Sequence, residues 1–188
     1  EVKKIATRES YGNALVELGK EHEDLIVLDA DLSGATKTGI FKKVFPERHI
    51  NCGIAEGNMM SVAAGLAATG KVAFASSFAM FASGRAYEQI RNSIGYPALN
   101  VKIGASHAGI SVGEDGATHQ ALEDVSLMRG LPNMTVIVPS DCNECEQVIE
   151  VAAKHEGPVY VRLSRNNLPD VYSSDYKFNT SFFCIKIR

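Results

Sequence analysis

Hydrophobic positions along this chain follow two alternating patterns, and the alternation predicts the fold class. Short runs that are apolar almost without a break, such as LIVLDAD at residues 25–31, are typical of strands buried on both faces of a sheet. Between these runs lie segments in which apolar residues such as Leu15 and Leu18 recur at helical spacing. Strands that alternate with helices indicate an α/β fold, so we expect a parallel sheet flanked by helices.

The expected elements alternate from residue 10 to residue 164. We expect strands at residues 25–31, 48–53, 72–76, 98–106, 134–140 and 158–164. We expect helices at residues 10–20, 40–44, 56–68, 78–94 and 144–154, with one more that passes through Leu127. The sequence thus predicts one domain over residues 1–170. We interpret residues 171–188 as a linker or terminal segment of uncertain packing.

Composition and charge limit the class of protein. The 188 residues are 45% hydrophobic and 22% charged, as in ordinary globular domains. The net charge is -3 and both signs are interspersed, which argues against nucleic-acid binding through a basic patch. No apolar run approaches the roughly 20 residues needed to cross a bilayer, and the first residues lack the apolar stretch of a signal peptide. We therefore expect a cytoplasmic protein that does not contact a membrane.

Two cysteines, Cys142 and Cys145, form a C-x-x-C pair where a predicted helix begins. No second pair follows at the spacing of a zinc ribbon. We favour two structural thiols. A redox role stays open and requires a depressed thiol pKa together with access to solvent.

Several residues with functional side chains follow directly after predicted strands. They are Asp31, Glu56, Phe78, His107 and Arg165. Ligands of parallel α/β sheets bind beyond the carboxyl ends of the strands. This shared position predicts a site at that edge of the sheet.

Glu56 lies at the start of a predicted helix, among small side chains. A carboxylate there is often a cap, because the helix dipole and the exposed N–H groups favour a negative charge. The glycines and alanines of NCGIAEGNMMSVAAGLAATG also let a flat ligand approach closely. The segment GIAEGNMMSVAAGLA resembles the one that carries the catalytic glutamate of transketolases and deoxyxylulose-phosphate synthases. The resemblance implies that Glu56 is catalytic and hydrogen-bonds the aminopyrimidine ring of thiamine diphosphate.

The segment SSFAMFASGRAYEQIR extends the resemblance. Phe78 and Phe81 are three residues apart, which places them on one face of the expected helix, and core packing alone would explain such a pair. Phenylalanines at these positions wall the cofactor's pyrimidine ring in the family, so both are cofactor-binding candidates. Gly84 stands where many transketolases carry a further aromatic residue, which leaves that part of the wall to Arg85 or Tyr87.

A glycine-rich loop, KIGASHAGISVGEDGATHQALED, carries the strongest resemblance. The spacing of His107, Asp115 and His119 is similar to the transketolase signature H-x-x-I-x-x-G-E-D-G-x-T-H-Q. The resemblance implies that His107 contacts the substrate phosphate, and that Asp115 and His119 contact sugar hydroxyls or the reacting carbonyl. Both histidines are also catalytic candidates. A zinc site is the rival hypothesis, but a histidine spacing of twelve with no cysteine in the loop fits no standard zinc pattern.

Two further residues complete the candidate site. The segment VYVRLSRNNLPD resembles the family pattern L-S-R-x-x-L-P, whose arginine binds the sugar phosphate; here it is Arg165. A guanidinium fork matches phosphate oxygens in bidentate fashion. Asp31, in DADLSG, matches an aspartate near the cofactor in relatives, and it could equally cap the following helical turn.

The sequence lacks the G-D-G signature through which thiamine-diphosphate enzymes hold Mg²⁺ and the diphosphate. The resemblance therefore implies that the chain itself binds no metal and that Mg²⁺ is bound by a partner domain. We expect the C-terminal section of a split transketolase, paired with an N-terminal-section subunit in a homodimer or heterotetramer. The small-residue helix at residues 56–68 is the expected place of subunit contact.

The expected activity is transfer of a two-carbon ketol unit between sugar phosphates, and the chain alone is expected to be inactive. A subunit or fragment of a 1-deoxy-D-xylulose-5-phosphate synthase is the close alternative. A non-catalytic binding or assembly module with the same fold is an alternative of a different class.

Overall fold

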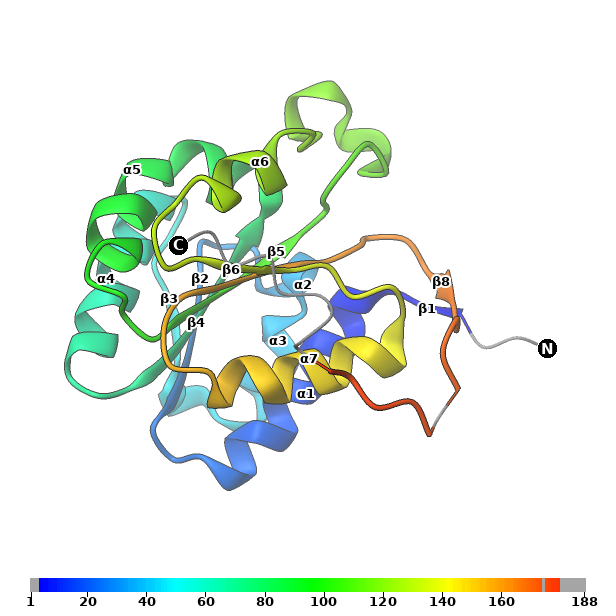
Figure 1. Cartoon of the computed structure of the whole chain (residues 1–188), viewed down its shortest axis with the longest axis horizontal. Coiled ribbons are helices and arrows are strands. Elements are labelled where there is room, and N and C mark those ends of the chain that lie inside the picture. The colour runs from blue at the N-terminus through cyan, green and yellow to red at the C-terminus, as the bar shows by residue number, and fades with distance from the viewer. Residues whose placement is uncertain (1–3, 174, 180–188) are drawn as a thin grey trace.

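The computed structural model describes residues 4–173 and 175–179, and it confirms the predicted fold class (Figure 1). Six parallel strands form the central sheet in the order β3-β2-β4-β5-β7-β6. Their bounds are β2 Leu25–Asp29, β3 His49–Asn51, β4 Val72–Phe78, β5 Val101–Ser106, β6 Thr135–Ile137 and β7 Val159–Arg162. A separate antiparallel pair joins β1 (Lys4–Ile5) to β8 (Leu168–Pro169) and so ties the two ends of the domain together.

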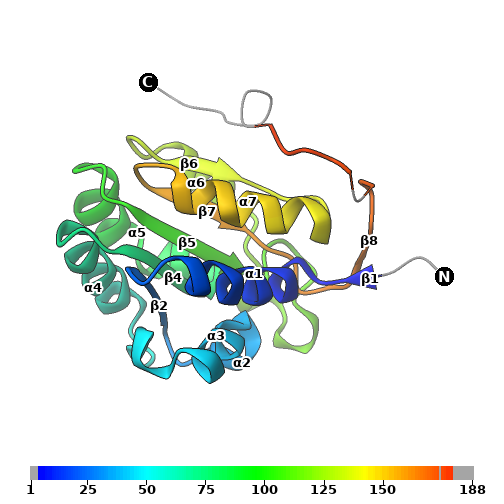
Figure 2. The ribbon, with the colours of Figure 1, turned by 90° about the horizontal axis from the view of Figure 1, so that it is seen from below.

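Helices cover both faces of the sheet (Figure 2). One layer consists of α1 (Thr7–Glu21), α3 (Thr38–Val44) and α7 (Cys142–Lys154), with the short α2 (Ser33–Thr36) leading into α3. The other layer consists of α4 (Glu56–Ala68), α5 (Tyr87–Gln89) and α6 (Asp124–Arg129). Among the described helices, none is long and apolar enough to cross a membrane.

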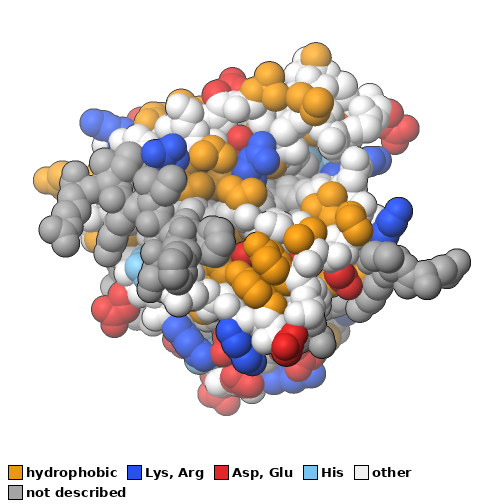
Figure 3. Space-filling view, turned by 45° about the vertical axis from the view of Figure 1, so that its right-hand side comes forward, with side chains coloured by type: hydrophobic (Ala, Val, Ile, Leu, Met, Phe, Trp, Pro, Cys, Tyr) orange, Lys and Arg blue, Asp and Glu red, His pale blue; other side chains and the backbone are white. Residues whose placement is uncertain are grey.

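The surface carries mixed charge. On the face shown in Figure 3, basic, acidic and apolar side chains lie close to one another rather than in separate fields. The interspersed charges of the sequence therefore remain interspersed on this face of the fold.

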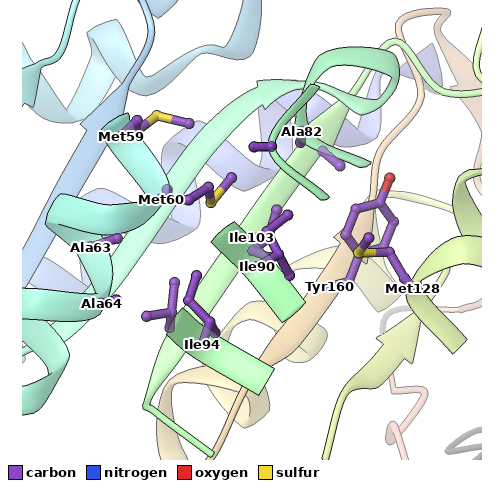
Figure 4. Packing of buried hydrophobic residues seen from close by; sticks show 14 of the residues in the cluster. Met59, Met60, Ala63, Ala64, Ala82, Ile90, Ile94, Ile103, Met128 and Tyr160 are labelled. Carbon is purple, nitrogen blue, oxygen red and sulfur yellow. The ribbon is translucent and has the colours of Figure 1, made fainter. Parts of the chain in front are cut away.

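The core between the sheet and α4–α6 is built from aliphatic and methionine side chains (Figure 4). Met59 and Met60 project from α4, Ile103 from β5, and Met128 from α6. All four are fully buried. Burial of an aliphatic side chain of this size contributes about 1.5–3 kcal/mol, so this layer holds α4 firmly against the sheet.

On the other face of the sheet, a side chain of α1 packs so closely against β5 that one position of this strand has to be glycine. Tyr11 of α1 reaches the sheet and its hydroxyl lies 2.6 Å from the hydroxyl of Ser76. A Cβ at Gly104 would overlap the Tyr11 hydroxyl. Only glycine leaves room for this contact.

Several predicted bounds differ from the structure, and two of the differences concern site residues. Strand β4 runs on to Phe78, so Phe78 ends a strand and does not share a helix face with Phe81. The expected helix at residues 78–94 is instead interrupted by two π-helical segments, Phe81–Arg85 and Ile90–Gly95. Strand β2 ends at Asp29, two residues before the predicted end at Asp31.

The segment that follows β8 lies along α7. Asp141, the N-cap of α7, accepts hydrogen bonds from the backbone N–H groups of Val171 and Tyr172, both at 2.7 Å. The side-chain amide of Gln147 bonds the backbone of Tyr176 and Phe178. The described part of the expected terminal segment is thus attached to α7 by side-chain to backbone hydrogen bonds, and the rest of that segment lies outside the described residues.

Candidate active site

Most of the predicted site residues meet at the carboxyl end of the sheet. A chain of contacts runs from Glu56 through Arg85, Phe81 and His119 to Phe78 and His107. These residues come from α4, from the end of β4 and the segment after it, and from the long loop after β5. Parallel strands that end at one edge bring these loops together.

Glu56 opens α4 and only 1% of its surface is exposed. Its carboxylate accepts two hydrogen bonds from Nη1 of Arg85, at 3.2 Å to Oε1 and 3.0 Å to Oε2. The position in the first helical turn stabilises the negative charge through the helix dipole. The structure therefore holds a buried carboxylate acceptor next to a cationic, half-exposed side chain.

Aromatic rings stack beside this carboxylate. The rings of Phe78 and His107 lie 3.8 Å apart between centroids and nearly parallel, and Phe78 is only 6% exposed. Phe81 stacks at 5.9 Å on Phe78, and His119 meets Phe81 edge-on at 5.1 Å. Phe81, which is partly exposed, offers the more accessible ring face of the two phenylalanines.

His107 is buried in a left-handed backbone conformation, with φ of 57°. Burial, followed by the charges of Arg8 and Arg165, lowers the pKa of its imidazole to about 4. The Nε2 atom lies 3.3 Å from Nη1 of Arg8, and Nδ1 lies 3.0 Å from the hydroxyl of Ser106. Because a guanidinium can only donate, Nε2 accepts this bond, and the proton of the neutral ring is on Nδ1.

Arg8 is a site residue that the sequence analysis missed. It lies in the first turn of α1, where its guanidinium donates to the backbone carbonyl of Ala35 (2.8 Å) as well as to His107. Burial and the charge of Arg165 lower the pKa of Arg8. A cation at a helix N-terminus opposes the helix dipole. This unfavourable position of an arginine in ATRESYG is the feature of the sequence that could have indicated a functional residue.

Arg165 packs against the loop that carries the other substrate candidates. A Cβ at Gly113 would come within 2.8 Å of Cζ of Arg165, and Gly113 has φ of 77°. Glycine at this position lets the loop lie against the guanidinium. Arg8, His107 and Arg165 thus form a basic cluster, in which the charges of both arginines lower the pKa of His107 and that of Arg165 lowers the pKa of Arg8.

Asp115 and His119 lie on short 3₁₀ turns of the same loop. The charge of Asp115 partly offsets the effect of the arginines on His107. Nδ1 of His119 lies 2.9 Å from the Thr118 hydroxyl. Within the described part of the chain, no cluster of three or more His, Cys, Asp or Glu side chains could hold a metal ion, and this disfavours the zinc hypothesis.

Asp31 lies on the loop after β2 and does not cap a helix. The N-cap of α2 is Leu32, which makes no side-chain cap bond. Instead, Asn51 holds the loop: its Nδ2 donates to Oδ1 of Asp31 (3.0 Å), and its Oδ1 accepts from the N–H groups of Asp31 and Gly53. The capping alternative is therefore wrong, and Asp31 stands at the edge of the sheet with a partly engaged carboxylate.

The two cysteines of the C-x-x-C pair are structural in this fold. Both are buried at the start of α7. The Cys142 thiol donates to the carboxylate of Asp170 at 2.9 Å, and the Cys145 thiol donates to the carbonyl of Thr7 at 3.3 Å. Burial raises the pKa of Cys145. The structure contradicts the redox alternative, which needs an accessible thiol of lowered pKa.

Comparison with known families and proteins agrees with this geometry. The family of the transketolase pyrimidine-binding domain matches residues 3–171. A Methanocaldococcus jannaschii protein named "Putative transketolase C-terminal section" is 58% identical over 168 residues, which cover 89% of this chain and 53% of that protein. Human transketolase is 42% identical over 93% of this chain and 28% of its own length.

A solved structure titled "Split gene transketolase, inactive beta4 tetramer" superposes with a TM-score of 0.84. It is 59% identical, and the match covers 93% of this chain and 56% of that one. The chain thus spans about half the length of the section-type relative and under a third of the full-length enzyme.

Proposed function

Because the chain belongs to the transketolase pyrimidine-binding domain family, we propose that it is the pyrimidine-binding subunit of a thiamine-diphosphate-dependent transketolase. One observation carries the proposal. The buried carboxylate of Glu56 and the ring of Phe81 lie at the same edge of the sheet as the basic cluster of Arg8, His107 and Arg165. A site for an aminopyrimidine thus adjoins a site for a sugar phosphate.

The residues fit the pyrimidine half of the cofactor. Glu56 supplies a buried carboxyl group that can share a proton with a ring nitrogen, and Phe81 supplies an aromatic face beside it. Stacking of aromatic rings contributes about 0.5–1.5 kcal/mol beyond buried area. Thiamine diphosphate, when bound, supplies the nucleophilic carbon that carries the ketol unit. Asp31 and Phe78 complete the proposed cofactor-binding set, with Phe78 supporting Phe81 from behind.

The basic cluster fits the phosphate of a sugar substrate. Arg8 and Arg165 provide guanidinium groups, whose planar forks suit phosphate oxygens. His107 adds a neutral imidazole between them at neutral pH, because its pKa is lowered to about 4. We assign the contacts with the sugar hydroxyls and the reacting carbonyl to Asp115 and His119, which lie on the same loop.

The proposed partner is an N-terminal-section subunit that binds the diphosphate and Mg²⁺. Three exposed apolar side chains close in sequence to site residues support a protein contact at this edge, namely Ile54, Ile110 and Leu122. The helix α4, which begins beside Ile54, is the proposed place of contact.

The test is to mix this chain with an N-terminal-section subunit, thiamine diphosphate and Mg²⁺, and to assay transfer from xylulose 5-phosphate to ribose 5-phosphate. We expect turnover in the mixture alone. Glu56→Ala should lower kcat at least about a hundredfold, the scale of a lost proton-transfer group. The exposed Glu150→Ala is the matched control and should leave the rate unchanged.

Other outcomes would change the assignment. Consumption of pyruvate with glyceraldehyde 3-phosphate, in place of ketol transfer, would indicate a 1-deoxy-D-xylulose-5-phosphate synthase subunit. If this chain associates with the N-terminal-section subunit but the mixture turns over neither substrate pair, a non-catalytic assembly module would be favoured.

A further inference from the structure

The Glu56 carboxylate is held by a side chain of its own chain. Arg85 donates from Nη1 to both carboxylate oxygens, and its Cζ lies 4.8 Å from the centre of the Phe81 ring. Among the described residues, Arg85 is the one side chain that donates a hydrogen bond to Glu56. One guanidinium therefore engages both the acceptor and the aromatic face of the proposed pyrimidine site.

A guanidinium resembles the edge of an aminopyrimidine in two respects. It is planar and stacks on aromatic rings, and it presents N–H donors along its edge. An aminopyrimidine that binds here would direct a ring edge to Glu56 and its flat face to Phe81. Because the Arg85 guanidinium lies at both carboxylate oxygens and over the Phe81 ring, a pyrimidine bound to Glu56 and stacked on Phe81 would have to take its place.

We infer that Arg85 is a gating residue, an internal competitor that must leave Glu56 before the pyrimidine ring can bind. This inference rests on the proposed function. The Arg85 side chain is 56% exposed, so its head group can turn to solvent without unpacking the core. Gly84, which precedes it, places no side chain beside the guanidinium, whereas the resemblance gives an aromatic residue at that position.

The contact sets a free-energy cost on cofactor binding. Breaking charge-assisted hydrogen bonds to a buried carboxylate must be offset by the bonds that the pyrimidine forms. Removing the guanidinium should therefore tighten pyrimidine binding, on the order of tenfold for one charge-assisted bond. Arg85→Met keeps a side chain of similar length over Phe81 while it removes the charge and the donors.

The experiment titrates 4-amino-2-methylpyrimidine into the whole chain and follows binding by NMR chemical shifts. Four proteins are compared: wild type, Arg85→Met, Arg85→Lys and the control Arg91→Met. Arg91 is exposed on the same segment and bonds Asn92, so its loss removes a similar charge without touching Glu56. We expect the dissociation constant to fall about tenfold in Arg85→Met and to be unchanged in Arg91→Met.

Arg85→Lys keeps the charge and guards against failure of Arg85→Met to fold. Because lysine lacks the planar fork, we expect binding tighter than wild type here too. Added methylguanidinium should compete with the pyrimidine in Arg85→Met. Equal or weaker pyrimidine binding in both Arg85 variants would overturn the gating role.

A further variant separates this inference from the proposed function. Glu56→Ala should weaken pyrimidine binding in an Arg85→Met background. If it does, while Arg85 substitutions leave affinity unchanged, the gate alone is wrong. If Glu56→Ala has no effect, the pyrimidine site is misplaced and both fail.

Discussion

The imidazole of His107 lies 3.3 Å from the guanidinium of Arg8 and also experiences the charge of Arg165, so its protonation depends on both cations. Arg8 and Arg165 disfavour a third positive charge, and burial adds to the effect. An anion bound by both arginines would offset their charge. The pKa of His107 should then rise from about 4 towards the usual histidine value of roughly 6.5.

This rise has a definite pH dependence. When the pKa of a group is higher in the bound state, the affinity rises as the pH falls below the pKa of the bound state. The affinity stops rising once the pH is below the pKa of the unbound state. We therefore expect sulfate, which does not titrate in this range, to bind this chain more tightly as pH falls from about 6.5 towards about 4. NMR titration of His107 with and without sulfate measures both values. His107→Asn should remove the pH dependence, and an unchanged pH profile in that variant would contradict the assignment.

At the scale of residues, site residues that belong to a long motif could be predicted from the sequence, whereas an isolated charged residue could not. His107, Asp115 and His119 came from one long pattern, and the structure places them on one loop. Arg8 stands 99 residues from His107 and belongs to an ordinary helix start, so only the folded sheet brings the two together. Long-range pairings of this kind leave no local signal.

At the scale of elements, α7 and the segment that follows β8 depend on one carboxylate. Asp141 caps α7 through a 2.8 Å bond from the N–H of Glu144, and its other oxygen holds Val171 and Tyr172. Asp141→Ala should cost on the order of 2–4 kcal/mol, from the lost cap and the two N–H groups left unbonded. Urea unfolding measures the loss, and a cost below that of the exposed Glu146→Ala would contradict it.

The strands were predictable as elements, and the segment after β4 was not. Apolar runs marked the strands of the central sheet apart from β3, because strands covered on both faces need apolar side chains at each position, whereas the three residues of β3 are not buried. The π-helical turns at Phe81–Arg85 and Ile90–Gly95 have no such pattern, since small and polar residues there fit an ordinary helix equally well. That irregular segment positions Phe81 and Arg85 beside Glu56.

At the scale of the whole molecule, the candidate site residues lie together at the carboxyl end of one sheet. The chain supplies a carboxylate, a ring wall and a basic cluster, from helix starts, the end of β4 and loops at one edge of a single sheet. Within the described residues, it supplies no cluster of ligands for the Mg²⁺ that would hold a diphosphate. The proposed function assigns the diphosphate and Mg²⁺ to a second subunit.

The most direct measurement is calorimetry of thiamine diphosphate with Mg²⁺, on this chain alone and on its mixture with an N-terminal-section subunit. At micromolar protein we predict heat of binding in the mixture only. Glu56→Ala or Phe81→Ala should abolish that heat, since each removes one of the two groups proposed to hold the pyrimidine. Absence of binding in the mixture would contradict the account and leave a transketolase-like fold without the proposed cofactor.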